Sequence, residues 1–484
     1  MKANPTAPDG ALDVIVVGGG ATGLVIAQQL SRASLRCLVL ESGPLLGAPP
    51  PADRAGYASA VEPLLKVDER RWRHRVEGSA AHWYRVRAAG GRTLLWGGWS
   101  IRPDEQNFLD AADLGAPWLF GLDRVHPYVE RVERLLGVRE GVIDPFFEPV
   151  ADELELELRP KRAALGADGL RPFVSLDAIQ GVRIRPHSVV TQVIRGRDGR
   201  VSGVEGIDAS TQTPFGLHAP IVVLCASAVE TARLLLASEL GGPQGPLPAI
   251  GKGLVDHLLT SYLVVRPEKP PEAAPGPLER AVSVGRFVNT DGERTRDYSS
   301  GFTLEVRGPS RLDQLGPEIL ANMGLDVASI VDLSLVAVFA IGEAVPHAGR
   351  HLTLDPKRKD SLGRAIPVLH LANSEDDLCM ARDMDETALA VADVLATPGS
   401  QIFPVYEPTS LTIVAHEAGT CRMGTDPETS VTDSFGAVHG VPGLYLGDAS
   451  VMPTALDRHP TLTLLAMALR TADHLIERVR HGRP

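Results

Sequence analysis

The sequence predicts an α/β protein of bilobal α+β organisation. One lobe is a Rossmann-type nucleotide-binding domain, and the other is a second domain built on a mostly antiparallel sheet. Two observations support this prediction. A G-x-G-x-x-G turn stands between two short apolar runs within Leu12–Gly43. Three strand-like runs between residues 302 and 356 then follow one another without helical patterns between them. The length of 484 residues fits two or three domains of roughly 150 residues each.

The first strand, turn and helix are expected to bind a diphosphate. VIVV is a β-branched run typical of a buried parallel strand, and a helical pattern follows the turn. Gly18 permits the tight turn, Gly20 lets the backbone approach the diphosphate, and Gly23 lets the helix pack on the strand. The next run, CLVL, ends at Glu41, where an acid binds ribose hydroxyls. This unit predicts an ADP-containing cofactor and does not distinguish NAD from FAD.

The middle of the chain predicts a loop, a hairpin and a second strand–helix pair. GGRTLLWGGWSIRP, residues 90–103, fits flat against a planar ring, although an ordinary loop with core tryptophans has the same pattern. The Asp198-Gly199 turn predicts a hairpin within residues 182–204. The strand IVVLCA and the helix SAVETARLLLAS, in residues 221–238, repeat the opening order and are expected to return the chain to the first sheet.

The second half predicts the other sheet. Residues 243–300 are rich in Pro, Gly and charge, which predicts loops and a flap over a site. FTLEV, DLSLVAVFAI and HLTLDP are expected strands of the mostly antiparallel sheet. Residues Glu375–Leu395 predict a helix with Ser374 as its N-cap.

Composition restricts the partners and the compartment. The net charge of −12 disfavours a nucleic-acid partner and suits a cationic small substrate, although soluble acidic enzymes in general share it. The four cysteines lie far apart without a CxxC pair, so we expect neither a metal nor a redox dithiol. Without a secretory signal pattern or an apolar run of about 18 residues, we expect a soluble, cytoplasmic protein with no membrane contact. The sequence does not indicate the oligomeric state.

The C-terminal part carries a series of short motifs that begins with HEAGTCRMG at His416. S-V-x-D starts at Ser430, H-G-V-x-G-L-Y at His439, D-A-S at Asp448 and H-P-T-L-T at His459. With the glycine turn, the GGRTLLWGGW loop, the LVDH motif and the VVLCASAVETARLLLAS segment, this series resembles the glucose–methanol–choline (GMC) family of oxidoreductases. The resemblance covers most of the chain in the family's order and is weakest over residues 266–350.

The resemblance implies FAD and hydride transfer from an alcohol to flavin N5. It implies that His416 is the general base and that His459 holds the substrate oxygen. An imidazole, with a reference pKa of about 6.5, suits proton removal near neutral pH. A helix that starts at Thr461 would stabilise negative charge at the flavin N1 side. His257 and His439 also occupy family positions, and we interpret both as structural.

Motif and resemblance together give the residues expected to contact FAD. We expect Glu41 to hold the adenosine ribose, Val190 to meet adenine through its backbone, and Asp448 to meet the diphosphate–ribityl region. The expected set is Gly18, Gly20, Ala21, Thr22, Gly23, Glu41, Ser42, Gly91, Arg92, Trp96, Gly97, Gly98, Val190, Ala226, Asp448, Ala449, Thr461 and Leu462.

The chain departs from one branch of the family at two positions. The GGRTLLWGG loop resembles the pyranose-oxidase-like branch, in which some members attach the flavin through a histidine just before the tryptophan. Leu95 stands there, so we expect non-covalent FAD. Many members of that branch have Asn where this chain has His459, and a His–His pair occurs in other branches.

The sequence therefore predicts an FAD-dependent alcohol oxidoreductase that acts on a polar small molecule, sugar-like or similar to an aminocyclitol or aminoglycoside. The electron acceptor is O2 or another molecule, and the sequence does not distinguish an oxidase from a dehydrogenase. The alternatives are a GMC-type lyase that uses the same histidines without net redox change, a non-catalytic flavoprotein and an NAD-dependent dehydrogenase.

The predicted domains are discontinuous. The FAD-binding domain is expected to comprise residues 1–50, 85–105, 180–262 and 410–484, and the substrate-binding domain residues 51–84, 106–179 and 263–409.

Overall fold

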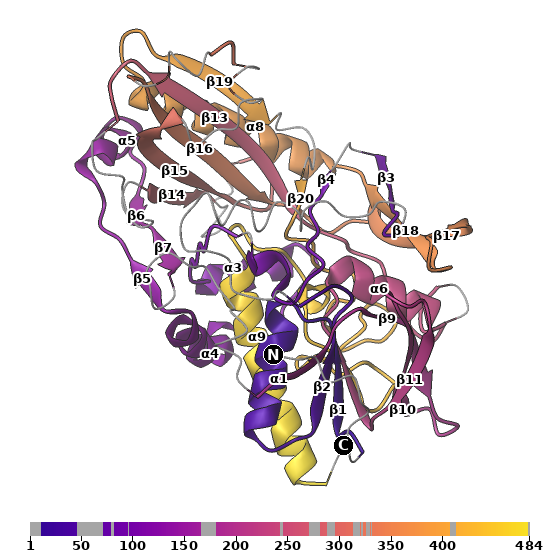
Figure 1. Ribbon diagram of the computed structural model, residues 1–484. Helices are drawn as coiled ribbons and strands as arrows, with labels where there is room; N and C mark the ends of the chain where they lie inside the picture. Colours follow the sequence, from indigo (N-terminus) through magenta and orange to yellow (C-terminus); the bar gives the residue numbers. More distant parts are fainter. Residues whose placement is uncertain are drawn as a thin grey trace.

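The computed structural model describes residues 11–45, 71–78, 82–94, 96–165, 181–242, 245–270, 281–287, 296–312, 320, 323–325, 330, 332–406 and 413–482. Figure 1 shows an elongated molecule with two lobes. One lobe is built around a parallel sheet, and the other around a larger antiparallel sheet.

A five-stranded parallel sheet with the order β21-β12-β1-β2-β8 forms the centre of the first lobe. The predicted strands are β1 (Val14–Val17) and β2 (Cys37–Leu40). Strand β12 (Ile221–Leu224) pairs in parallel with β1, which confirms the predicted return of the chain to this sheet. The outer strands are β8 (Arg183–Arg185) and β21 (Leu444–Leu446).

Two helices from opposite ends of the chain cover one face of this sheet. Helix α1 (Ala21–Arg32) lies beside α9 (Thr461–Arg480), as Figure 1 shows. Alternate residues of a strand face opposite sides, and Val14 of β1 shares its core with Ile26 and Ala468 of the two helices. The first and last segments of the chain therefore pack into one unit.

A three-stranded antiparallel sheet with the order β11-β10-β9 belongs to the same lobe. Strands β9 (Ser188–Arg195) and β10 (Val201–Asp208) form the hairpin predicted around Asp198-Gly199. Strand β11 (Pro214–His218) completes the sheet, and the predicted helix α6 (Ala228–Ala237) contacts β9.

The second lobe contains a six-stranded antiparallel sheet with the order β19-β13-β16-β15-β14-β6. Strands β15 (Phe302–Arg311) and β16 (Ser334–Glu343) confirm two predicted strands. The outermost strands are β6 (Leu158–Pro160) and β19 (Gln401–Tyr406).

The prediction of loops over residues 243–300 is wrong at two places. Strand β13 (His257–Arg266) pairs with β16 along ten residues, and β14 (Ala281–Phe287) pairs with β15. The prediction rested on the proline-rich stretch after β13 and overlooked the apolar residues of HLLTSYLVVR. Residues 271–280, which belong to the predicted flap, lie outside the described part of the chain.

Helix α8 (Glu375–Leu395) has the predicted bounds and packs against β13 and β16. Ser374 forms the predicted N-cap as part of a capping box. Its Oγ accepts from the Asp377 N–H at 3.1 Å, and the Asp377 carboxylate accepts from the Ser374 N–H at 2.7 Å. Close packing on the sheet requires Gly342, because a Cβ there would lie 2.5 Å from Met384 Sδ.

The predicted strand HLTLDP belongs to a different sheet from the one expected. It lies in β17 (Arg350–Lys359), which pairs with β18 (Ala365–Leu371), and β3 (Arg75–Gly78) completes this small sheet. The hairpin β17–β18 contacts α6 of the first lobe, so it lies beside the nucleotide-binding unit. Local sequence defines the strand, but packing on α6 decides its location.

The other described elements are β4 (His82–Trp83), η1 (Gly91–Leu94), α3 (Glu105–Asp113), α4 (Leu122–Leu136), β5 (Val138–Glu140), η2 (Pro145–Phe147), α5 (Glu148–Leu154), β7 (Arg162–Ala164), β20 (Ile413–Val414) and η5 (Ala449–Val451). The division into two domains stays a prediction, and the expected boundary at residue 262 falls inside β13.

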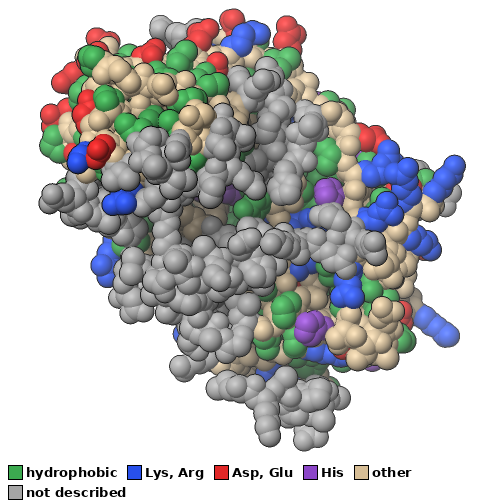
Figure 2. Space-filling model, turned by 45° about the horizontal axis from the view of Figure 1, so that its top comes forward, with side chains coloured by type: hydrophobic (Ala, Val, Ile, Leu, Met, Phe, Trp, Pro, Cys, Tyr) green, Lys and Arg blue, Asp and Glu red, His purple; other side chains and the backbone are tan. Residues whose placement is uncertain are grey.

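Charge is distributed unevenly over the surface. Figure 2 shows acidic side chains gathered on the end of the molecule that carries α8 and the large sheet. Basic side chains gather over the hairpin β17–β18, where Lys357, Arg358 and Lys359 are exposed. The net charge of −12 therefore does not describe the local field at a given site. Among the described residues, no helix has both the length and the apolar character needed to cross a bilayer.

Candidate active site

A cavity of about 890 Å³ runs from the glycine turn to the two C-terminal histidines. Its wall includes Glu41 at one end and His416 and His459 at the other. All the residues expected to contact FAD line this cavity except Gly23 and Leu462, which pack beneath its wall. Most of the expected residues, from segments spread over the whole chain, therefore line one cavity.

The glycine turn fits a diphosphate. Gly18 has φ +105°, and a Cβ on it would lie 2.2 Å from the Cys225 carbonyl oxygen. A Cβ on Gly23 would lie 2.0 Å from the Gly18 carbonyl oxygen, which explains the need for glycine where the helix packs on the strand. At Gly20, the N-cap of α1, a Cβ would meet no atom within 4 Å. The open space therefore lies at the N-terminus of α1, where backbone N–H groups attract an anion.

Glu41 is fixed in the wall of the cavity, as expected of a ribose-binding acid. It is 5% exposed, and its carboxylate accepts hydrogen bonds from the N–H groups of Gly19 at 2.8 Å and Gly43 at 2.7 Å. Ser42 Oγ also donates to Oε1, at 3.1 Å, so Oε2 retains the further lone pair for a ribose hydroxyl. Folding therefore orients this acid before a ligand arrives.

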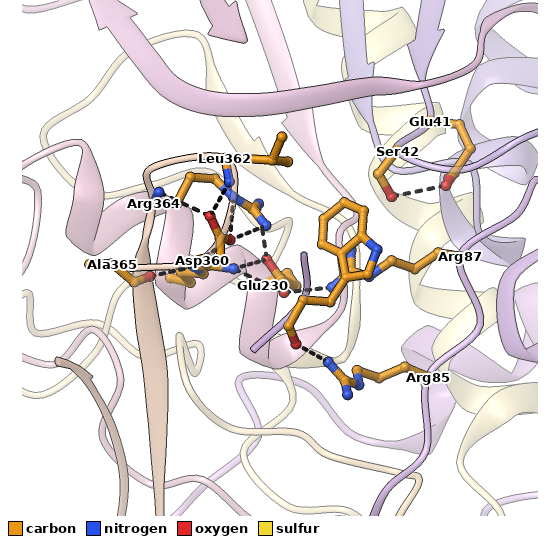
Figure 3. A network of polar contacts seen from close by, with 11 residues as sticks. Glu41, Ser42, Arg85, Arg87, Glu230, Asp360, Leu362, Arg364 and Ala365 are labelled. Carbon is orange, nitrogen blue, oxygen red and sulfur yellow. Dashed lines mark hydrogen bonds and ion pairs between the residues drawn. The ribbon is translucent and has the colours of Figure 1, made fainter. Parts of the chain in front are cut away.

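The sequence analysis missed a charged network at the same end of the cavity. Figure 3 shows Arg87, Glu230, Asp360 and Arg364 converging from separate segments. Glu230 pairs with Arg87 at 2.7 Å, and Asp360 pairs with Arg364 at 2.7 Å and with Arg233 at 2.9 Å. Burial alone would raise the pKa of Glu230, but Arg233 and Arg87 hold it well below its usual range. The network ties the hairpin β17–β18 to α6.

The GGRTLLWGGW loop lies beside the glycine turn, where Gly90 N–H donates to the Gly19 carbonyl at 2.8 Å. The Arg92 side chain reaches the C-terminal segment and donates to both oxygens of Glu417, at 2.5 and 3.0 Å. This bidentate pair fixes the loop to the HEAGT motif. The prediction from Leu95 falls on a residue outside the described part of the chain.

Hydrogen bonds define which nitrogen of His416 carries its proton. His257 Nε2 lies 2.9 Å from the Leu456 carbonyl, which only accepts, so this nitrogen carries a hydrogen and Nδ1 is the acceptor. His416 Nδ1 lies 3.0 Å from that acceptor and therefore donates to it. The Asp256 carboxylate accepts from the His416 backbone N–H at 3.0 Å and holds the segment in place. His416 Nε2 is left with a free lone pair.

His416 is suited to remain neutral and accept a proton. Burial, followed by the neighbouring His257 and His459, holds the pKa of His416 well below its usual range. A buried base with a free lone pair can take a hydroxyl proton from a bound alcohol.

Glu305 on β15 holds the other side of His459. His459 Nε2 lies 2.7 Å from Glu305 Oε1 without hydrogen-bond alignment, so the contact is chiefly electrostatic. Burial alone would raise the pKa of Glu305, but His459 and Arg307 lower it to about 2, and the carboxylate is ionised. The other ring nitrogen, His459 Nδ1, faces His416 Nε2 at 3.5 Å.

A metal centre was not expected, yet Asp256, His257 and His416 place three potential ligand atoms within 4.8 Å of one another. Each of these groups already has a partner in the described residues. The two imidazoles share a hydrogen bond, and Asp256 accepts from the backbone N–H groups of both histidines. The hydrogen bonds alone account for this cluster.

Acidification is expected to destabilise the fold through His257. Burial and the nearby His459 lower the pKa of His257 from 6.5 to about 4 in the folded protein. The unfolded chain then binds this proton more tightly, so stability is lost as the pH falls below 6.5. Lowering the pH from 7.5 to 5 is expected to cost about 2 kcal/mol of unfolding free energy through this residue.

Denaturant titrations of the wild type and His257→Asn at pH 7.5 and pH 5 measure this contribution. The asparagine side chain retains a donor for the Leu456 carbonyl but does not titrate. Between pH 7.5 and pH 5, we expect His257→Asn to lose about 2 kcal/mol less unfolding free energy than the wild type. An equal loss in both proteins would contradict the assigned role.

Sequence reasoning missed the residues that surround the two histidines. Glu305 lies in a strand that was predicted correctly, but nothing in FTLEV indicates that its acid faces His459. His257 was interpreted as structural, and it contacts His416 directly. The other residue interpreted as structural, His439, contacts the Gly424 carbonyl at 3.1 Å.

Comparisons with known proteins agree with these features. Models of the GMC oxidoreductase family match residues 170–259 and 346–468, and a model of the NAD(P)-binding Rossmann-like domain matches residues 16–49. The chain is 25% identical to 2-methyl-1,2-propanediol dehydrogenase of Mycolicibacterium austroafricanum, over 96% of this chain and 95% of that protein. It is 26% identical to paromamine 6'-oxidase of Streptomyces fradiae, over 95% of this chain and 90% of that protein.

A solved structure has the same fold. The chain superimposes on the crystal structure of pyridoxine 4-oxidase from Mesorbium loti with a TM-score of 0.67 and 20% identity. The match covers 96% of this chain and 99% of the other.

Proposed function

Because the chain belongs to the GMC family of FAD-dependent oxidoreductases, we propose that it oxidises a polar, polyhydroxylated alcohol of the sugar type. The arrangement that supports this most strongly is the His416–His459 pair, whose facing nitrogens are 3.5 Å apart in the wall of the cavity. FAD supplies the hydride acceptor when it is bound, and we propose that it is held without a covalent bond.

In the proposed reaction, the two histidines have different tasks. His416 Nε2 takes the hydroxyl proton, because His257 occupies its other nitrogen. His459 lies beside the same oxygen, orients it, and is itself positioned by Glu305. The start of α9 at Thr461 follows directly and offers free N–H groups to negative charge in the cavity. The protein thereby orients the alcohol and removes its proton.

The glycine turn and Glu41 would hold the diphosphate and the adenosine ribose, on the basis of the open space at Gly20 and the fixed carboxylate. Asp448 lines the same cavity, and its carboxylate accepts from Thr231 Oγ1 at 2.6 Å. In our proposal, a cofactor held by these residues would present its redox end to His416 and His459.

An aminocyclitol or aminoglycoside is the second candidate substrate. One relative is a paromamine oxidase, and the net charge of −12 suits a cation. The experiment below also tests whether the electron acceptor is O2 or another molecule. A lyase using the same histidines is the alternative reaction, and it would leave the flavin oxidised.

Anaerobic mixing of the purified FAD-loaded protein with sugars, polyols, aminocyclitols and simple alcohols tests the proposal. We expect polyhydroxylated alcohols to bleach the flavin absorption band, and readmitted air or an artificial acceptor to restore it. Conversion of a substrate without bleaching would support the lyase. Absence of both across the whole panel would contradict catalysis by this protein.

A further inference from the structure

We propose that Lys161, Arg307 and the ring of Trp99 form a subsite for a carboxylate on the substrate, next to His459. The preferred substrates are then polyhydroxylated acids of the sugar-acid type. This inference rests on the proposed function and specifies its substrate class.

Lys161 is a buried cation without a direct ion pair in the described part of the chain; the nearby Glu305 contacts Arg307 and His459 instead. Its side chain is 8% exposed, and Nζ lies 4.7 Å from the centroid of the Trp99 ring. No carboxylate of the described residues forms an ion pair with this ammonium. Burial, followed by the nearby Arg307, lowers the pKa of Lys161 to about 8. Proteins rarely bury an unpaired ammonium, because its desolvation is not compensated.

Arg307 adds a second positive charge at the same ring. Its Cζ lies 5.2 Å from the Trp99 centroid, and its side chain is 42% exposed. The guanidinium donates to Glu305 at 2.9 Å, but Glu305 also pairs with His459. The Glu305 carboxylate therefore has two partners. The two cations of the subsite, Lys161 and Arg307, lie near this one carboxylate, which His459 also contacts.

Two other buried carboxylates close to the two histidines have arginine partners of their own. Glu417 pairs with Arg92 at 2.5 Å, and Asp457 pairs with Arg458 at 2.7 Å. A third, Asp256, accepts from the backbone N–H groups of His257 and His416, and none of the three forms an ion pair with Lys161. The positive charge beside Trp99 is therefore a local property, although the whole chain carries −12.

The fold connects Lys161 to the loop that carries Trp99 and, through Trp99, to His459. Lys161 connects β6 of the large sheet to β7, and β7 is bonded to the loop that carries Trp99. Ser100 N–H donates to the Arg162 carbonyl at 2.9 Å, and Ala164 N–H donates to the Gly98 carbonyl at 2.7 Å. Trp99 in turn stacks on His459, with ring centroids 6.2 Å apart. Trp99 lines the cavity together with both histidines, so a substrate held between the histidines would reach the subsite at this ring.

Three six-carbon polyols with different end groups test the inference. D-Sorbitol ends in a neutral hydroxymethyl group, D-gluconate in a carboxylate and D-glucamine in an ammonium. Their dissociation constants are measured anaerobically on the FAD-loaded protein from changes in the flavin spectrum, which also report any reduction. We expect gluconate to bind roughly 10- to 100-fold more tightly than sorbitol, and glucamine to bind most weakly.

Variants assign the preference to Lys161. Lys161→Met keeps an apolar chain on Trp99 and is expected to lose the preference for gluconate over sorbitol. Lys161→Arg is expected to retain the preference. Lys357→Met removes one charge from the exposed hairpin and serves as the matched control. If Lys161→Met does not fold, Lys161→Gln replaces it, and the wild-type preference remains a test by itself.

The outcomes separate this inference from the proposed function. Flavin reduction by sorbitol without a gluconate preference would overturn the subsite and leave alcohol oxidation intact. A Lys161-dependent preference without reduction by any alcohol would support the subsite and contradict the proposed function. The subsite would also be overturned if Lys161→Met slowed only the reoxidation of flavin by O2, or if none of the three polyols bound.

Discussion

Alanine in place of His416 is expected to slow reduction of the flavin by substrate by roughly 10²- to 10⁴-fold, the usual contribution of a general base. The substitution removes the free lone pair that His257 holds in position through the 3.0 Å hydrogen bond. The protein should retain FAD, because the glycine turn and Glu41 lie at the other end of the cavity. Anaerobic stopped-flow absorbance measures the rate, and the absorption spectrum measures FAD content.

His218→Ala is the matched control for this experiment. This exposed histidine lies at the end of β11, and its ring contacts the Ser202 carbonyl at 3.2 Å. Its replacement should leave the reduction rate unchanged. If His416→Ala reduced its flavin at the wild-type rate, the proton would have to leave through another group, and His459 would be the next candidate.

Valine in place of Gly20 is expected to give a folded protein that does not retain FAD. Gly20 has φ −72° and ψ 179°, which valine adopts readily, and a Cβ there meets no protein atom within 4 Å. The side chain would instead fill the space at the N-terminus of α1. Loss of charge-assisted hydrogen bonds to a diphosphate, at about 1.5–3 kcal/mol each, should weaken FAD binding by roughly 10²-fold or more.

Acid precipitation followed by absorbance of the supernatant measures FAD content, and it also tests the proposed non-covalent attachment. Circular dichroism measures folding independently of the cofactor. Gly23→Val is the contrasting variant, because a Cβ at that position collides with the Gly18 carbonyl oxygen and should disrupt the fold itself. Full FAD occupancy in Gly20→Val would place the diphosphate away from the glycine turn.

The net charge of the chain and the local charge beside His459 favour different substrate classes. The value of −12 suggested a cationic ligand, but acidic side chains gather on the lobe that carries α8. Beside His459 the fixed groups are Lys161 and Arg307 against the shared Glu305. Local charge depends on which strands bring their side chains together, and a sum over the sequence does not contain that information.

The sequence by itself determined the elements that depend on local physics. The spacing of Gly18, Gly20 and Gly23, the capping box at Ser374 and the helix start at Thr461 follow from backbone geometry over a few residues. The histidine motifs also predicted both residues at the end of the cavity.

Tertiary structure alone decided the contacts that give these residues their chemistry. His257 orients His416 because β13 brings it beside a segment that lies 159 positions later in the chain. Glu305 reaches His459 because the register of β15 turns alternate side chains toward that segment. Such contacts depend on the packing of distant strands and leave no periodic signal in the chain, since each residue satisfies its own strand pattern whichever partner it meets.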